Sequence, residues 1–290
     1  MSYRIITDSA ADLPESFIEE HDVQVLPLMV NWRGEEHEDR TVDLNTFYQS
    51  LSDGEVAKTA QIPVNKFDAY FRQMAEKGEP VLYIAFSSGL SGTYQTAVMV
   101  ADQIKEEYPD FDLTIIDTKA ATLGMGLIVM KAVLLKAMGK TKAEVEEAVH
   151  FYVDHIQHIF SVGNLDYLYR GGRLSKTSAV VGAMLGVIPI LHVTEEGKLE
   201  KIDQIRGRKK LLKKMVETFG VNGAGHEQSE FTFVYSPDVK EESQKMQAMV
   251  EEKFGAKVLA ERELGVVIGA HTGNQLHAVF FLDTKDPYFE

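Results

Sequence analysis

The sequence predicts an α/β protein of two domains, and three observations support this. The chain has 290 residues, more than one compact domain usually contains. Its first half alternates strand-like apolar runs with helical patterns, which predicts a doubly wound, mainly parallel sheet. Its second half mixes a hairpin signal with helices, which is typical of an α+β domain. We therefore expect an N-terminal domain over residues 1–155, a C-terminal domain over residues 156–290, and a ligand at or near their interface.

The N-terminal domain is predicted from apolar runs of strand length between amphipathic segments. Asp12 caps the first predicted helix with Pro14 just inside it, and Pro27 marks the second strand as an edge strand or a bulge. The expected strands are Tyr3–Thr7, Val23–Val30, Val81–Phe86 and Leu113–Ile116. The expected helices start at Asp43, at Pro63 and after Thr93, and two more cover Leu123–Met138 and Thr141–His155. In such a sheet, ligand loops follow the carboxyl ends of the strands.

The C-terminal domain is predicted from a different order of strands and helices, which includes a hairpin. The turn Glu195-Glu196-Gly197-Lys198 joins two strands into a hairpin. The expected strands are Ile156–Val162, Ile188–Thr194, Leu199–Arg206, Phe231–Tyr235, Lys257–Glu261 and His277–Asp283. The expected helices are Asn164–Arg170, Ser175–Leu185, Lys209–Phe219 and Val239–Phe254. The sequence shows no low-complexity linker, so the two domains are expected to share a packed interface.

Composition argues against several classes of protein. The net charge of −14 disfavours nucleic acid as a partner, because phosphates repel an acidic surface. Cysteine is absent, which excludes disulfides and a thiol nucleophile and fits a reducing cytosol. The N-terminus lacks the pattern of a signal peptide. Residues 177–194 carry no charge, but Gly182, Gly186 and Pro189 interrupt them, so a buried helix leading into a strand is expected. The sequence predicts a soluble, cytoplasmic protein without integral membrane association.

The loop Ser87–Thr93 is the strongest local signal. It follows a buried strand, opens a helix and contains four hydroxyls and two glycines. Backbone N–H groups at such a point attract an anion, while a single serine, Ser88 or Ser91, could equally serve as a helix cap. The loop lacks the lysine of a phosphate-binding P-loop, and Gly89-Leu90-Ser91-Gly92-Thr93 lacks the final glycine of a hydrolase elbow. It therefore indicates anion binding without a catalytic signature.

Other polar residues carry weaker signals. Asp8 and Asp117 each end a predicted strand, and we interpret them as organisers of loops, since no third ligand has metal-binding spacing. His271 is expected in a loop between Gly265 and Gly273, where it could face a ligand or be an ordinary satisfied histidine. Neither a metal nor a cofactor is expected.

A basic segment contrasts with the acidic chain. It runs over Arg206–Lys214, and Arg170 with Arg173 forms a smaller basic site around two glycines. Such a segment can dock an acidic partner, bind nucleic acid or form a solvated helix face, and the last is the usual case.

Four motifs, in this order along nearly the whole chain, resemble those of the DegV family. They are Thr7-Asp8-Ser9, Phe86-Ser87-Ser88-Gly89-Leu90-Ser91-Gly92-Thr93-Tyr94, Gly171-Gly172-Arg173-Leu174-Ser175 and Gly269-Ala270-His271-Thr272-Gly273. The resemblance implies a two-domain carrier that binds a long-chain fatty acid and presents it to a separate fatty acid kinase catalytic subunit. That subunit makes the acyl phosphate, so the chain itself is expected to have no enzymatic activity and no nucleotide site.

The resemblance also implies roles for particular residues. It places the carboxylate of the fatty acid near Thr59, Ser91 and His271, although Ala60 and Ile62 depart from the family pattern around Thr59. The remaining residues of the expected ligand site are Asp8, Ser9, Ser88, Gly92 and Thr93. Arg173 and Arg206 correspond to arginines that interact with the kinase. Residues 178–191, rich in small and apolar side chains, could form a tunnel wall or ordinary core.

Two alternatives of other classes remain open from the sequence. A hydrolase or transferase would use Ser91 as the nucleophile and His271 as the base. A nucleic-acid-binding regulator would use Arg206–Lys214, against the overall charge.

Overall fold

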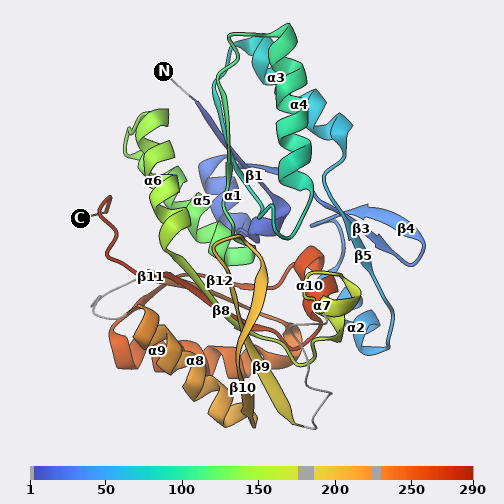
Figure 1. Cartoon of the computed structure of the whole chain (residues 1–290), viewed down its shortest axis with the longest axis vertical. Coiled ribbons are helices and arrows are strands. Elements are labelled where there is room, and N and C mark those ends of the chain that lie inside the picture. The colour runs from blue at the N-terminus through green and yellow to red at the C-terminus, as the bar shows by residue number, and fades with distance from the viewer. Residues whose placement is uncertain (1–2, 176–185, 224–229, 290) are drawn as a thin grey trace.

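The computed structural model describes residues 3–175, 186–223 and 230–289, and these form three β-sheets surrounded by helices (Figure 1). Sheet A has four strands and belongs to the N-terminal half of the chain, while sheet C has six and belongs to the C-terminal half. Sheet B has three short strands. The predicted fold class, an α/β protein with a mainly parallel first sheet and a separate mixed one, is confirmed.

Sheet A is parallel throughout, with the strand order β2-β1-β6-β7. Its strands are β1 (Arg4–Asp8), β2 (Gln24–Leu26), β6 (Val81–Ala85) and β7 (Leu113–Asp117). The helices near it are α1 (Glu15–His21), α3 (Val64–Lys77), α4 (Thr93–Glu107), α5 (Thr122–Ala137) and α6 (Lys142–His155). Helices α3 and α4 lie on one side and α5 and α6 on the other (Figure 1). Since the strands are parallel, the loops after β1, β6 and β7 meet at one carboxyl edge.

Sheet C has the strand order β10-β9-β8-β13-β11-β12 and is antiparallel except between β11 and β12. Its strands are β8 (Ile156–Ser161), β9 (Val187–Val193), β10 (Leu199–Arg206), β11 (Glu230–Tyr235), β12 (Lys257–Glu263) and β13 (His277–Leu282). Helices α8 (Arg208–Asn222) and α9 (Lys240–Phe254) cover one face (Figure 1). The domain boundary at residues 155/156 stays a prediction; α6 ends and β8 begins there.

Strand alternation gives sheet C two apolar faces. Ile159 and Phe281 belong to a cluster with α8 and α9. Phe160 and Phe280, their neighbours on the same strands, belong to the larger core shared with the N-terminal half. Sheet C is therefore covered by its own helices on one face and by the sheet A half on the other.

Sheet B and its surroundings correct one sequence prediction. The predicted strand Val23–Val30 is not continuous: it divides at Pro27 into β2 of sheet A and β3 (Met29–Trp32) of sheet B. Strand β3 pairs with β4 (Glu35–Glu38) and β5 (Lys58–Ala60), and α2 (Leu44–Ser52) lies between these in sequence. The short, polar β4 and β5 lack the alternation that would have predicted them.

Two further predictions about local structure were wrong. Asp12 does not cap a helix: it has a left-handed φ of 49° at the end of the 3-10 helix η1 (Ser9–Ala11), and α1 begins after Pro14. Its carboxylate instead accepts a hydrogen bond from the backbone N–H of Gly265 at 3.2 Å, across the two halves of the chain. His271 lies not in a loop but in the short helix α10 (Val266–Thr272). The predicted helix Ser175–Leu185 lies outside the described residues, apart from Ser175.

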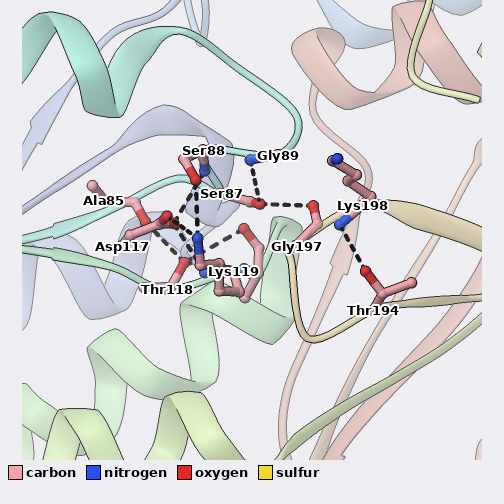
Figure 2. Close-up of polar contacts among 11 residues, drawn as sticks. Ala85, Ser87, Ser88, Gly89, Asp117, Thr118, Lys119, Thr194, Gly197 and Lys198 are labelled. Carbon is pink, nitrogen blue, oxygen red and sulfur yellow. Dashed lines mark hydrogen bonds and ion pairs between the residues drawn. The ribbon is translucent and has the colours of Figure 1, made fainter.

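The tip of the β9–β10 hairpin docks on the carboxyl edge of sheet A (Figure 2). The Ser87 hydroxyl donates to the carbonyl oxygen of Gly197 at 2.8 Å, and it accepts from the backbone N–H of Gly89. Beside this contact, Lys119 bridges the Asp117 carboxylate at 2.6 Å and the Ser88 hydroxyl at 3.0 Å. The hairpin tip thus connects sheet C to the loops that follow β6 and β7.

None of the helices among the described residues combines the length and apolar character that crossing a bilayer requires.

We expect Gly197→Ala to destabilise the protein more than Gly34→Ala does. Both glycines occupy hairpin turns with positive φ, 74° and 83°, so alanine costs about 1–2 kcal/mol of backbone strain at either position. At Gly34 no other atom lies within 4 Å of the added Cβ, but at Gly197 the Ser87 oxygen lies 2.2 Å away. Overpacking should add about 1–3 kcal/mol there. Urea unfolding measures both losses, and equal losses would contradict the docking of the hairpin.

Candidate ligand-binding site

A largely apolar cavity lies between the carboxyl edge of sheet A and the inner face of sheet C. Phe86, Leu90 and Ala121, from the loops after β6 and β7, line it on one side. Phe160 and Phe280, from β8 and β13, line it on the other. The lining is mostly hydrophobic, with a few polar side chains, as is common in small-molecule sites. We call it the inter-sheet cavity.

A threonine and a histidine meet at the wall of this cavity. Thr59 lies in β5, where it pairs with Val30 of β3, and His271 lies in α10. The Thr59 hydroxyl is 2.6 Å from Nε2 of His271, a hydrogen-bonding distance, and both residues line the cavity. Sheet B and α10 therefore bring together two residues that are 212 positions apart in the sequence.

His271 is held in this position by a close approach to Gly171, which directly follows α7 (Asp166–Arg170). A Cβ atom at Gly171 would lie 2.1 Å from Nδ1 of His271, so only glycine leaves room for the ring. Nδ1 is buried and has no hydrogen-bond partner among the described residues. Burial and, to a smaller extent, the positive charge of Arg173 together lower the pKa of His271 to about 4. The imidazole is therefore neutral at pH 7.

Ser91 joins this group from the loop after β6. Its hydroxyl lies 2.9 Å from the Thr93 hydroxyl and accepts a hydrogen bond from the Thr93 backbone N–H at 3.2 Å. The N-cap residue of α4 is Gly92, whose conformation is helical. Ser91 thus braces the first turn of α4 and at the same time lines the inter-sheet cavity. Both interpretations of this serine, structural and ligand-facing, are compatible with its position.

Arg173 links the loop after β6 to the segment after α7. Its Nε donates to the carbonyl oxygen of Leu90 at 3.0 Å, and its guanidinium also donates to the carbonyl of Gly171. Burial lowers the pKa of Arg173, but a guanidinium stays charged in proteins. The positive charge therefore lies at the cavity wall beside His271.

Outside this wall lies a second, more polar hollow, which we call the outer depression. Thr59, Arg173 and His271 line both the cavity and the depression. Lys58 and Arg170 add positive charge to the outer side. The three shared residues thus form a polar boundary between an apolar interior and a cationic surface.

The other residues predicted for the site organise the surrounding loops. The buried Asp8 carboxylate accepts hydrogen bonds from the Phe86 N–H at 2.9 Å, the Tyr83 hydroxyl at 2.8 Å and the Ala10 N–H at 3.1 Å. Burial raises the pKa of Asp8 to about 6. The Ser9 hydroxyl accepts from the Leu28 N–H at 3.0 Å.

The rest of the predicted set lies beside the cavity without lining it. Ser88 contacts Lys119, and Gly92 and Thr93 begin α4. Asp8, Ser9, Ser88, Gly92 and Thr93 are all absent from the described lining of the inter-sheet cavity. Their assignment to the ligand site stays a prediction, and the contacts above give them structural roles. Arg206 is exposed at the end of β10, so it does not belong to the cavity.

Sequence reasoning missed several residues of the cavity. His158 and Thr122 line it, and neither was singled out from the sequence. Side chains alternate between the two faces of a strand, so His158 shares a face with Phe160 and not with Ile159. This alternation could have placed the histidine in the cavity wall. The predicted wall at residues 178–191 lies mostly outside the described residues; Val193, just beyond it, lines the cavity.

Comparison with known proteins gives the family. Residues 2–284 match the model of the family described as "Uncharacterised protein, DegV family". A DegV domain-containing protein of Clostridium perfringens is 37% identical over 287 residues, which cover 98% of each chain. The chain belongs to the DegV family. The sequence-based identification is therefore confirmed.

Solved structures of similar proteins have the same fold. One from Eubacterium ventriosum, described as a stearic-acid-binding protein, has a TM-score of 0.89 and 26% identity, covering 97% of this chain and 99% of that one. One from Thermus thermophilus, described by its fatty acid binding, has a TM-score of 0.86 and 29% identity over the same shares.

Among the described residues of this DegV family protein, no group of three or more His, Asp or Glu side chains is arranged to hold a metal ion.

We expect Gly171→Ala to displace His271, whereas Gly172→Ala should not. The Cβ added at Gly171 would collide with Nδ1 of His271 and separate the ring from Thr59, with a loss of about 1–3 kcal/mol of stability. Gly172 has a φ of 71° but no atom within 4 Å of the added Cβ, so alanine there introduces only backbone strain. The side-chain ¹⁵N resonances of His271 report the difference. Equal perturbation by both substitutions would contradict the proposed support of the ring by Gly171.

Proposed function

We propose that this protein is a fatty-acid carrier that presents its ligand to a separate fatty acid kinase catalytic subunit. The observation that carries the proposal is the polar boundary formed by Thr59, His271 and Arg173 between the apolar inter-sheet cavity and the outer depression. A long-chain acid has the matching polarity, with an apolar chain and one charged end. The two solved relatives described as fatty-acid-binding support the same ligand class.

The cavity supplies most of the binding free energy in this proposal. Burial of an acyl chain contributes about 0.8 kcal/mol per methylene, so some fifteen methylenes give roughly 12 kcal/mol before the costs of binding. Each hydrogen bond to the head group contributes only about 1–3 kcal/mol. The polar groups at the boundary mainly remove the penalty of burying an unpaired carboxylate.

The head group would be held by donors and one nearby charge. The hydroxyl of Ser91 can donate to a carboxylate oxygen, and so can that of Thr59 when Nε2–H of the neutral His271 donates to Thr59. Arg173 supplies the positive charge that a neutral imidazole does not. Asp8, Ser9, Ser88, Gly92 and Thr93 would act by fixing the loops that present these groups.

A serine hydrolase is the alternative, and the contacts of its two key residues argue against it. The hydrogen-bonding neighbour of the Ser91 hydroxyl is Thr93, and that of His271 is Thr59. No described residue accepts from Nδ1 of His271, so no third group orients the ring as a catalytic base requires.

The outer depression is lined by Lys58, Arg170 and Arg173. Its positive charge suits a phosphorylated or acidic partner surface.

The basic segment supports a protein partner better than nucleic acid. Two of its charges are already paired, Arg208 with Glu242 at 3.1 Å and Lys214 with Asp203 at 3.6 Å. Arg206 is exposed, and in our proposal it contacts the kinase, as does Arg173 at the depression. Phosphoryl transfer needs a nucleotide cradle and bound Mg²⁺, and we assign both to the partner. A cytoplasmic location fits a reaction that uses ATP.

The protein purified from cells should retain a fatty acid, detectable by native mass spectrometry. Thr59→Val, which removes one hydroxyl at nearly constant volume, should weaken binding of a fluorescent fatty acid about tenfold, the effect of one hydrogen bond to a charged group. Thr218→Val is the matched control, because the Thr218 hydroxyl bonds to the Lys214 carbonyl in α8, on the far face of sheet C. Absence of any retained or added fatty acid would refute the carrier function.

Acyl phosphate should form only when the partner kinase is present. The protein with fatty acid, ATP and Mg²⁺ alone should give none, and acyl phosphate in that mixture would overturn the assignment of catalysis to the partner. With the kinase added, Arg206→Ala should retain fatty acid binding but slow acyl-phosphate formation. Lys245→Ala, which removes an exposed charge from α9, is the control and should leave the rate unchanged.

A further inference from the structure

Helix α10, which carries His271 to the cavity wall, is a short helix that depends on its neighbours. It spans Val266–Thr272, about two turns, and a helix of that length is not stable in water without tertiary contacts. Helices α2 and α7 lie beside it and contact it (Figure 1). The position of His271 therefore depends on the residues that hold this helix.

Tyr48 of α2 contacts α10 and its flanking residues at three points. Its hydroxyl donates to the carbonyl oxygen of Leu264, just before the helix, at 2.9 Å. In the middle of the helix, a Cβ atom at Gly269 would lie 2.5 Å from the Tyr48 hydroxyl oxygen, so the glycine allows the helix to approach the phenol this closely. Just after the helix, the side-chain amide of Asn274 donates to the backbone carbonyl oxygen of Tyr48 at 3.2 Å. Tyr48 thus supports α10 at both ends and in the middle.

The surroundings of Tyr48 keep its hydroxyl a hydrogen-bond donor. The residue is 3% exposed. Burial and, to a smaller extent, the negative charge of Asp12 raise the pKa of Tyr48 well above its ordinary value, so the phenol stays protonated at neutral pH. Asp12 itself accepts from the backbone N–H of Gly265, the N-cap residue of α10. Two buried residues of the N-terminal half therefore hold the start of a helix that belongs to the C-terminal half.

Gly269 and His271 lie on opposite sides of α10. An α-helix has 3.6 residues per turn, so side chains two positions apart point ~200° away from each other. Because Gly269 rests against Tyr48, the ring of His271 points away from the phenol. On that side it meets Gly171 and the Thr59 hydroxyl. A shift of α10 relative to Tyr48 would therefore move the ring relative to Thr59.

We propose that Tyr48 is a positioning residue for the head-group site: it holds α10 from behind and so keeps His271 at hydrogen-bonding distance from Thr59. Tyr48 is absent from the described lining of both the inter-sheet cavity and the outer depression, so it acts through the helix. Its effect on ligand binding rests on the proposed carrier function, whereas its effect on the His271 ring needs no ligand.

The first test compares how variants bind a long-chain fatty acid and the methyl ester of the same acid. Tyr48→Phe removes the hydroxyl alone, and it should weaken binding of the acid about tenfold relative to the ester, the effect of one hydrogen bond to a charged group. The ester has the same chain without the charge, so a general loss of stability would weaken both ligands alike. Tyr152→Phe is the matched control, because its buried hydroxyl donates to Asp286 at 3.2 Å in α6, and it should leave the ratio unchanged.

The second test measures the pKa of His271 in the empty protein by following its side-chain ¹⁵N resonances with pH. Burial is the main cause of the low value, about 4, in the wild type. If Tyr48→Phe loosens α10, water reaches the ring and the pKa of His271 should rise toward its ordinary value near 6.5. Tyr152→Phe should leave it unchanged.

A double variant tests whether the phenol acts by direct contact with the helix. Gly269→Ala alone should push α10 away from Tyr48 and lower the acid-to-ester ratio. In the Tyr48→Phe protein the missing oxygen leaves room for the added methyl group, so the same alanine should lower the ratio less. Equal effects of the alanine in both proteins would contradict direct support by the phenol.

The outcomes of these tests separate the proposal from the carrier function. An unchanged ratio or an unchanged pKa of His271 in Tyr48→Phe would overturn the proposal, as would equal changes in Tyr152→Phe. If Tyr48→Phe does not fold, Asn274→Ala releases the other end of α10 from Tyr48 and should change the ratio and the pKa in the same directions. If the wild type binds neither acid nor ester, the carrier function is refuted, and the pKa of His271 still decides whether Tyr48 positions the ring.

Discussion

The arrangement of this molecule depends on one constraint: sheet C is apolar on both faces, and both must be covered. Helices α8 and α9 cover the face that carries Ile159 and Phe281. The other face, with Phe160 and Phe280, is met by the carboxyl edge of sheet A, and that edge consists of loops. Loops carry backbone polar groups that need partners, which is why the Asp8 carboxylate and the Ser87 hydroxyl are buried there. The cavity is the space that these loops leave over the sheet.

The electrostatics of the cavity follow from the same burial. The pKa of His271 falls to about 4 and that of His158 to about 3 because burial disfavours the charged imidazole. Between these values and the ordinary value near 6.5, the unfolded chain binds protons that the native protein does not, so the histidines' contribution to stability is lost as pH falls through that window. The pKa of Asp8 is raised to about 6, so as pH falls its carboxyl is protonated in the native protein before it is in the unfolded chain. Its contribution to stability therefore rises as pH falls through this range. Near neutral pH the wall is thus uncharged except at Arg173.

The sequence predicted the parallel sheet and singled out the loop Ser87–Thr93 because both have local signals. β1, β6 and β7 are apolar runs, and the loop Ser87–Thr93 concentrates hydroxyls and glycines between a strand and a helix. Sheet B was missed because β4 and β5 are short and polar. Thr59 came into the predicted site through family resemblance, since no local pattern indicates that β5 contacts α10. The placement of His271 in a helix, and of His158 in the cavity wall, depends on tertiary contacts. The periodicity of apolar residues along the sequence does not reveal such contacts.

The two cavity histidines are supported in the same way but differ in their hydrogen bonds. Each ring rests against a glycine, His271 on Gly171 and His158 on Gly124, because no other residue leaves space for the imidazole. The two rings differ at the nitrogen that does not face the glycine. Nε2 of His271 meets the Thr59 hydroxyl, so that ring belongs to a polar group already formed before a ligand arrives. The ring of His158 hydrogen-bonds to no described residue; its Nε2 faces Gly124, and the ring packs edge-on against Phe280. The cavity wall is therefore polar at His271, as the proposed head-group site requires, whereas the ring of His158 is enclosed by Gly124 and Phe280.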